Sequence, residues 1–204
     1  MSEEDEKKSI IDLVRHGETT AGQCFLGSTD AQLSELGWQQ MESAGLLLDY
    51  DVVISSPLLR CYEFASRYAE KIHKPLIVDA QLREIHFGQW EAKTAEQICK
   101  TDEKKLSAFW RDPVKHTPPD GESLLAFKER VLQAYYSIVD EWQGKKILLA
   151  CHGGVIKMIL CDLLAIETQK MNKIAIDYAG VSRVSMWEDI SQISFINHVS
   201  LKQE

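Results

Sequence analysis

The sequence predicts an α/β fold, a three-layer α/β/α sandwich built on a mostly parallel sheet. Continuous apolar runs at 10–14, 52–55 and 147–151 are typical of short strands that are buried on both faces of a sheet. Helical patterns separate these runs, and strands that alternate with helices form parallel sheets covered on both sides. At 204 residues the chain is within the size of one domain, which we expect over residues 10–204.

Other segments complete the expected order of elements. We expect a strand at 181–187, a weaker one at 76–78 and an edge strand within 193–199. Four helices are expected beside these strands. They span residues 34–48, 57–72, 122–142 and the stretch from just after His152 to Leu163.

Local signals support the helix boundaries. Proline at position 57 suits the first turn of a helix, because that turn does not use its backbone N–H. The helix expected at 122–142 has its apolar residues on one stripe. Asp120 or Ser123 can cap its start, and Gly144 can end it.

Composition and charge limit the classes of partner. The first residues are mostly charged, so we expect a flexible tail at 1–9 and no secretory signal. The longest apolar runs have about five residues, far fewer than the ~20 of a membrane-spanning helix, so no membrane partner is expected. A net charge of −8 disfavours binding to nucleic acid, so a phosphate ligand needs arginines gathered inside a pocket.

The cysteines and histidines show no spacing typical of a metal site. The five cysteines are odd in number, widely spaced and without a Cys-x-x-Cys pair. This argues against a disulfide framework and against a structural zinc site. We therefore expect a cytoplasmic protein without a metal or other cofactor, and the sequence leaves its oligomeric state open.

The segment 89–120 interrupts the alternation of strands and helices. It has a helical pattern at first and is then loop-like, with prolines at 113, 118 and 119. Insertions of this kind often cover a functional site. We expect this one to cover the site and to influence which substrate enters.

Two histidines follow buried strands. His16 comes just after the run at 10–14, and His152 comes directly after the run at 147–151. Ligands bind at the carboxyl ends of strands in an open α/β sheet, so we expect both imidazoles to face one pocket. Together with Arg15, they suggest nucleophilic chemistry on a phosphate.

His16 is the candidate nucleophile. A neutral imidazole attacks phosphorus well when one ring nitrogen is free and the N–H of the other is held by an acceptor. An isolated histidine at a strand end is more often a satisfied structural side chain. Here Arg15 and Gly17 on either side favour the chemical role.

Phosphate-binding residues are expected beside both histidines. Arg15 and Arg60 are candidates because the guanidinium fork matches two phosphate oxygens, although a surface ion pair is the alternative for Arg60. His152, if protonated, would hold phosphoryl oxygens, and a core histidine is the alternative. Gly153 lets backbone N–H groups at a helix start approach an anion.

Glu84 is the candidate general acid and base, because a leaving alkoxide needs a proton and the later attack of water needs one removed. A salt bridge with Arg83 is the alternative. His86 lies two residues from Glu84, and His116 lies in the insertion. Both are possible substrate contacts.

Five motifs in this chain resemble the histidine phosphatase superfamily, also called the phosphoglycerate mutase-like family. A lone Arg-His-Gly is a weak signal, whereas five motifs in the order of the family are specific. The resemblance covers residues 10–187, nearly the whole chain. The motifs lie at 13–19, 55–60, 83–91, 120–123 and 151–154.

The resemblance implies a role for each candidate. His16 becomes phosphorylated, Arg15, Arg60 and His152 bind the phosphate, and Glu84 donates and accepts protons. A glycine follows the second histidine, where the acid-phosphatase and phytase branch has an aspartate. This sequence therefore resembles the branch in which Glu84 is the proton donor.

One position departs from the family pattern. The family usually has an asparagine six residues after the nucleophile, where this chain has Gly22, and the following loop looks about two residues short. A phosphate donor is then missing, or Gln23 or a backbone N–H supplies it. Phosphate affinity or turnover is expected to suffer.

Within the family, residues 86–91 and 119–123 look most like α-ribazole-5′-phosphate phosphatases of cobalamin nucleotide-loop assembly. This resemblance implies metal-independent hydrolysis of a small-molecule phosphate ester. The alternatives are a broad-specificity phosphatase, a cofactor-dependent phosphoglycerate mutase and a non-catalytic module that binds a phosphorylated ligand.

Overall fold

The computed structural model describes residues 8–46, 48–187 and 190–199, and it contains one six-stranded sheet in the order β3-β2-β4-β1-β5-β6. Neighbouring strands among β1 to β4 pair in parallel, β5 pairs antiparallel with β1, and β6 pairs antiparallel with β5. The predicted fold class is therefore confirmed. The strands are β1 (Ser9–Arg15), β2 (Val52–Ser55), β3 (Leu76–Val78), β4 (Lys146–Cys151), β5 (Val181–Trp187) and β6 (Ile190–His198).

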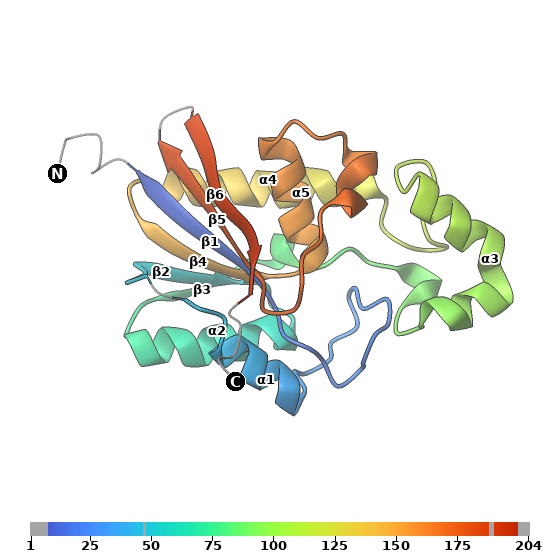
Figure 1. Ribbon diagram of the computed structural model, residues 1–204, viewed down its shortest axis with the longest axis horizontal. Coiled ribbons are helices and arrows are strands. Elements are labelled where there is room, and N and C mark those ends of the chain that lie inside the picture. Colours follow the sequence, from blue (N-terminus) through green and yellow to red (C-terminus); the bar gives the residue numbers. More distant parts are fainter. Residues whose placement is uncertain (1–7, 47, 188–189, 200–204) are drawn as a thin grey trace.

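Helices cover both faces of this sheet (Figure 1). Alternate residues of a strand point to opposite faces, so Leu13 packs on one side and Val14 on the other. The face with Leu13 is covered by α4 (Leu124–Glu141) and α5 (Gly153–Leu163). The face with Val14 is covered by α1 (Glu35–Glu42) and α2 (Leu59–Ile72).

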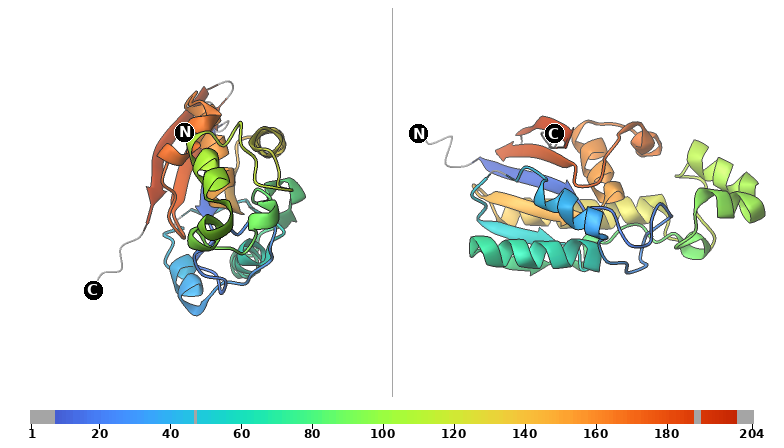
Figure 2. Two further views of the ribbon diagram at one scale, coloured as in Figure 1. Left: turned by 90° about the vertical axis from the view of Figure 1, so that its right-hand side faces the viewer. Right: turned by 60° about the horizontal axis from the view of Figure 1, so that its bottom comes forward.

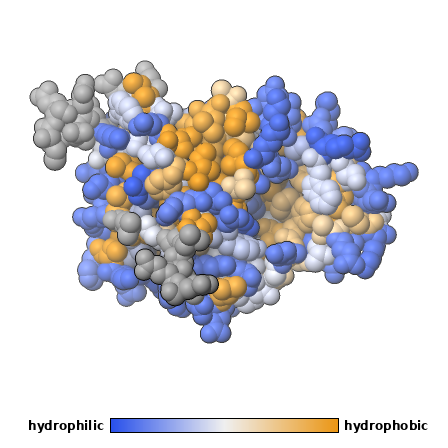
Figure 3. Space-filling model, viewed as in Figure 1, coloured by the Kyte–Doolittle hydropathy of each residue, from blue (hydrophilic) through white to orange (hydrophobic). Residues whose placement is uncertain are grey.

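A further helix, α3 (Ala95–Arg111), stands apart from the sheet, beyond the end at which β1 and β4 finish (Figures 1 and 2). It bends at Asp102, whose backbone is not helical. Its buried side chains pack with Trp90 in a separate small core. The outer surface of the part formed by α3 is hydrophilic in the space-filling view, and paler to hydrophobic colour lies on its side toward the sheet (Figure 3).

Two helix boundaries differ from the prediction. The expected helix at 34–48 ends at Glu42, because the chain turns at Ser43 and Gly45 takes a left-handed backbone with a φ of 67°. The expected helix at 57–72 begins at Leu59, so Pro57 precedes it. The Leu59 N–H donates to Oδ1 of Asp30 at 2.8 Å, which caps the helix from a distant loop.

Other boundaries agree closely with the prediction. Ser123, one of the two expected caps, accepts a hydrogen bond from the Ala126 N–H at the start of α4. Most of the expected tail at 1–9 lies outside the described residues, and Ser9 already belongs to β1. None of the helices in the described ranges is long and apolar enough to cross a membrane.

The middle of the sheet holds a buried ion pair. Asp12 of β1 is 1% exposed and accepts two hydrogen bonds from the Arg183 guanidinium of β5, at 2.7 and 2.8 Å. The Tyr50 hydroxyl also donates to Asp12, at 2.5 Å. Every oxygen of this buried carboxylate is therefore satisfied inside the protein.

Candidate active site

A cavity of about 640 Å³ opens at the end of the sheet where β1 and β4 finish. Arg15, His16, Glu84 and Gly153 line it, so four predicted site residues from distant parts of the chain meet there. Ala95, Phe109, Trp110 and Pro113, from α3 and the loop after it, form part of the opposite wall.

His16 is held as a neutral imidazole. Its Nδ1 lies 2.7 Å from the carbonyl oxygen of Gly17, which only accepts, so Nδ1 carries the proton and Nε2 keeps a free lone pair. Burial, and then the nearby charges of Arg60 and Arg15, lower the pKa of His16 well below its ordinary value. A neutral ring with one free nitrogen is the form that attacks phosphorus.

Arg15 presents its guanidinium beside this ring. Nη1 donates to the carbonyl oxygen of Ile176 at 2.6 Å, and the guanidinium stacks on the Tyr178 ring at 4.2 Å. Nε is buried and has no hydrogen-bond partner among the described residues. Because buried donors are normally paired, this free donor in a cavity suits an anionic ligand.

His152 lies behind His16, with 5.3 Å between the ring centroids, and is fully buried. Its Nδ1 accepts from Nε of Arg60 at 3.2 Å, and its Nε2 lies 2.8 Å from the Ser56 hydroxyl. Since an arginine only donates, Nδ1 is unprotonated. Burial and the Arg60 charge also lower the pKa of His152 well below its ordinary value. The ring of His152 is therefore neutral in this structure, and the protonated form that would hold phosphoryl oxygens is not the one present.

Arg60 is fully buried and does not line the cavity. Besides His152, its guanidinium donates to the carbonyl oxygens of Leu26, Gly27 and Thr29 at 2.7 to 3.2 Å. The alternative of a surface ion pair for Arg60 is thus wrong. Its charge remains close enough to His16 to lower the pKa of that imidazole.

Residues 26–29, which we call the clamped loop, are held on their other side by Glu91. The Glu91 carboxylate accepts from the backbone N–H groups of Gly27, Ser28 and Thr29 at 3.0 to 3.2 Å, and from the Thr29 hydroxyl at 2.6 Å. Burial alone would raise the pKa of Glu91, but these hydrogen bonds outweigh it and the pKa is lowered. Arg60 therefore binds the carbonyl groups of the loop, and Glu91 binds its amides.

Glu84 reaches the cavity from the segment before α3. Its Oε2 accepts from the N–H of Gly154 at 2.9 Å, and its Oε1 accepts from its neighbour Ile85 at 3.0 Å. A Cβ at position 154 would lie 2.2 Å from Oε1 of Glu84, so only glycine allows this approach. The Gly153 N–H is at the first turn of α5, where backbone donors have no partner inside the helix.

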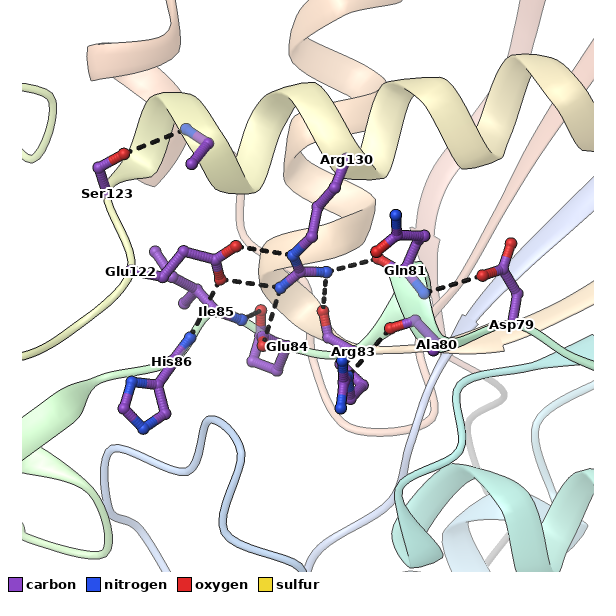
Figure 4. A network of polar contacts seen from close by, with 11 residues as sticks. Asp79, Ala80, Gln81, Arg83, Glu84, Ile85, His86, Glu122, Ser123 and Arg130 are labelled. Carbon is purple, nitrogen blue, oxygen red and sulfur yellow. Dashed lines mark hydrogen bonds and ion pairs between the residues drawn. The ribbon is translucent and has the colours of Figure 1, made fainter.

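Arg130 holds the backbone around Glu84 in place (Figure 4). Arg130 of α4 donates to the carbonyl oxygens of Gln81, Arg83 and Glu84. The Glu122 carboxylate binds the same guanidinium at 2.7 and 2.9 Å. The alternative for Glu84, a salt bridge with Arg83, is not among the ion pairs of the described residues, and Glu84 lines the cavity.

Comparison with known proteins agrees with this geometry. The family profile described as "Histidine phosphatase superfamily (branch 1)" matches residues 11–199. The chain belongs to the histidine phosphatase superfamily. The predicted resemblance is therefore confirmed.

The relatives of this chain in the superfamily include proteins named for different substrates. The chain is 29% identical over 190 residues to "Putative phosphoserine phosphatase 2" of Hydrogenobacter thermophilus, covering 91% of this chain and 93% of that protein. It is 26% identical to the adenosylcobalamin/α-ribazole phosphatase of Escherichia coli, covering 91% and 94%. The structure of Bacillus stearothermophilus YhfR is similar with a TM-score of 0.88 at 27% identity, covering 94% and 98% of the two chains.

The three predicted substrate contacts of this histidine phosphatase do not all lie at the cavity. Gln23 is exposed and lines the cavity beside Gly22, which has a φ of 69° and where an added Cβ would have no atom within 4 Å. His86 and His116 are exposed and do not line the cavity, so the structure gives no support to a contact with substrate. Within the described residues, no cluster of three or more His, Cys, Asp or Glu side chains could hold a metal ion.

Several functional-site residues escaped the sequence analysis. Tyr178 precedes β5, and because β5 runs antiparallel to β1, its first residues return to the end where β1 finishes. Lys157 lies one helical turn after Gly153, a spacing that places both on one face of a helix. Glu91 lies in the motif at 83–91 but was given no role, and Arg130 carried no local signal, because most of their partners are backbone groups of other segments.

Proposed function

We propose that the protein is a phosphomonoester phosphatase that works through a phosphohistidine at His16. The observation that carries this proposal is the hydrogen bond from Nδ1 of His16 to the carbonyl oxygen of Gly17. It leaves Nε2 as a nucleophile in a cavity where Arg15 has a free donor. A structural histidine would have both ring nitrogens satisfied, as His152 does.

The reaction has two steps. Nε2 of His16 attacks phosphorus, the bond from phosphorus to the alcohol oxygen breaks, and Glu84 gives its proton to that oxygen. A water molecule then attacks the phosphohistidine while Glu84 takes a proton from it. The products are the free alcohol and inorganic phosphate, and both side chains return to their starting forms.

Charge on the phosphoryl group is stabilised from several sides in this proposal. Arg15 and the N–H of Gly153 bind its oxygens directly, because both line the cavity. Arg60 and His152 lie behind His16 and do not line the cavity, and the buried guanidinium acts through its charge. Protein groups are thus available for each role, and we propose that hydrolysis needs no metal.

Two substrate classes have specific support. The motifs at 86–91 and 119–123 and the aromatic wall formed by Phe109 and Trp110 favour α-ribazole 5′-phosphate, which has a flat aromatic base. The likeness to a protein named for phosphoserine favours a small alcohol that carries a carboxylate. Both are small-molecule phosphate esters.

The proposal is tested with an aryl phosphate in the presence of EDTA. The protein should release inorganic phosphate, and His16→Ala should lower kcat by about 10³-fold or more because it removes the nucleophile. His73 is exposed at the end of α2 with a left-handed φ of 53°, so His73→Asn is a matched control. Rapid quenching should trap an acid-labile phosphoryl group on the peptide with His16. Equal turnover by His16→Ala and the parent protein would refute the mechanism.

A further inference from the structure

Lys157 is a charged residue of the cavity wall that the proposed reaction does not use. It lies on α5 and lines the cavity together with Gly153, one helical turn away. Its ammonium group is 3.5 Å from Oδ1 of Asn172, at the edge of hydrogen-bond distance. No carboxylate of the described residues lies within 4.0 Å of it, whereas the surface lysines Lys100 and Lys170 have such partners at 2.9 and 2.7 Å.

The cavity that Lys157 lines has a partly apolar wall. Leu124, Met171 and Ile176 line the same cavity, and they offer no hydrogen-bond acceptor from their side chains. Burial lowers the pKa of Lys157, and the negative charge of Glu84 only partly opposes this effect. A half-buried cation that has no direct ion pair among the described residues is stabilised when an anion binds beside it.

The phosphoryl site does not use this charge directly. Arg15 and the first turn of α5 already surround His16, and Lys157 lies four residues after Gly153, about 6 Å further along the helix axis. An ester whose phosphoryl group lies beside His16 can extend through the same cavity to Lys157.

We propose that Lys157, positioned by Asn172, binds a carboxylate on the alcohol half of the phosphate ester. The substrate class is then a small phosphorylated hydroxy acid or hydroxy amino acid. This inference rests on the proposed phosphatase function, because it assumes that the phosphate lies beside His16. It selects the carboxylated class over α-ribazole 5′-phosphate, which has no carboxylate.

The first test compares substrates that differ in the carboxylate alone. O-phosphoserine is compared with O-phosphoethanolamine, and 3-phosphoglycerate is compared with glycerol 3-phosphate. The parent protein should have a kcat/KM about tenfold or more higher for the carboxylated member of at least one pair. A ratio near one in both pairs would overturn the inference, as would a clear preference for α-ribazole 5′-phosphate.

The second test removes the charge of Lys157 in two ways. Lys157→Met keeps much of the side-chain length and should reduce the kcat/KM ratio to about one, mainly through KM. Asn172→Asp keeps Lys157 and adds a carboxylate at the 3.5 Å contact, so it should reduce the ratio in the same direction. Lys157→Arg should keep the preference. A ratio that survives both Lys157→Met and Asn172→Asp would show that the pair only holds α5 to the following turn.

A control variant separates local charge from net charge. Lys173 lies next to Asn172 but does not line the cavity, so Lys173→Met changes the net charge equally. It should leave the substrate ratio unchanged. A fall in the ratio equal to that of Lys157→Met would contradict a specific contact.

Binding measurements keep this inference separate from the reaction. The His16→Ala variant is titrated with O-phosphoserine and with O-phosphoethanolamine by calorimetry, since neither is turned over. Tighter binding of O-phosphoserine that disappears in His16→Ala/Lys157→Met supports the carboxylate site even if the parent protein hydrolyses nothing. Hydrolysis of the aryl phosphate together with equal binding of both ligands would overturn the inference and leave the proposed function intact.

Discussion

Two polar clusters on the same strand differ in how completely the protein satisfies them. In the middle of β1, both oxygens of Asp12 are bound by Arg183 and Tyr50. At the end of the strand, Nε of Arg15 has no partner in the described ranges of the chain, and His16 keeps a free ring nitrogen. A buried polar group with all partners inside the protein stabilises the fold, whereas one with an open donor or acceptor beside a cavity is suited to a ligand.

The largest effect on stability should follow from removing Asp12 from the fully paired cluster in the middle of β1. Asp12→Ala leaves Arg183 and Tyr50 without their acceptor, and we expect the free energy of unfolding to fall by about 3 kcal/mol. Urea unfolding measures this loss. His16→Ala, four residues further along the chain, should change stability by less than about 1 kcal/mol while it abolishes turnover.

The double variant Asp12→Leu/Arg183→Met is the control for this prediction. It replaces the pair by apolar side chains of similar size, which is often close to neutral for a buried ion pair. We expect it to recover most of the stability lost in Asp12→Ala. A stability loss as large as the single variant's would mean that the packing around β1, and not the unpaired arginine, sets the cost.

The next effect is a loss of stability at acid pH, which arises from the cluster at the strand end that contains His16 and His152. The pKa values of His16 and His152 are lowered well below 6.5 by burial and by Arg60, whereas the unfolded chain has ordinary values near 6.5. Below about pH 6.5 the unfolded state therefore binds protons that the folded state does not. The free energy of unfolding should fall with decreasing pH, by up to about 1.4 kcal/mol per pH unit for each histidine.

Unfolding at about pH 7.5, 6.5 and 5.5 measures this slope, which should be small in the upper half of the range. His16→Ala should reduce the slope in the lower half by up to about 1.4 kcal/mol per pH unit, because it removes one of the two imidazoles. An unchanged slope in that variant would contradict a neutral, buried His16.

The smallest effect concerns two adjacent glycines that differ in their neighbours. A Cβ at position 154 would lie 2.2 Å from Oε1 of Glu84, whereas a Cβ at position 153 would lie 3.4 Å from Nε of Arg15. Gly154→Ala should displace the Glu84 carboxylate and lower kcat about tenfold, because a small displacement of the acid slows proton transfer. Gly153→Ala should cause a clearly smaller loss. The measurement is kcat of each variant on an aryl phosphate. Equal losses of kcat would argue against Glu84 as the acid.

Much of the fold was predictable because its strands are short and buried on both faces. The runs at 10–14, 52–55 and 147–151 carry that pattern, and the strand-end rule then places His16 and His152 together. The helix expected at 34–48 was too long, because apolar residues continue past Ser43 while the backbone turns at Gly45. The spacing of apolar residues indicates which side chains are buried, but it does not show where the backbone stops being helical.

The roles of long side chains were harder to predict. Arg60 was expected to bind phosphate in the pocket, but its reach allows it to bind three carbonyl groups of a loop about thirty residues earlier. Lys157 had no signal beyond its spacing from Gly153, because the identity of its partner depends on the packing of Asn172. Such contacts depend on tertiary arrangement, and local pattern does not encode them.

The clamped loop has a consequence for how substrate preference can change during evolution. Arg60 and Glu91 hold residues 26–29 mostly through backbone groups, so the loop keeps its place whatever side chains it carries at most positions. Gly27 is the exception, because a Cβ there would lie 2.1 Å from the carbonyl oxygen of Ile85. Leu26 faces the cavity and has no such restriction. Mutation at Leu26 can therefore reshape the wall of the cavity without loosening its anchor, which makes this position an adaptable one beside a fixed backbone.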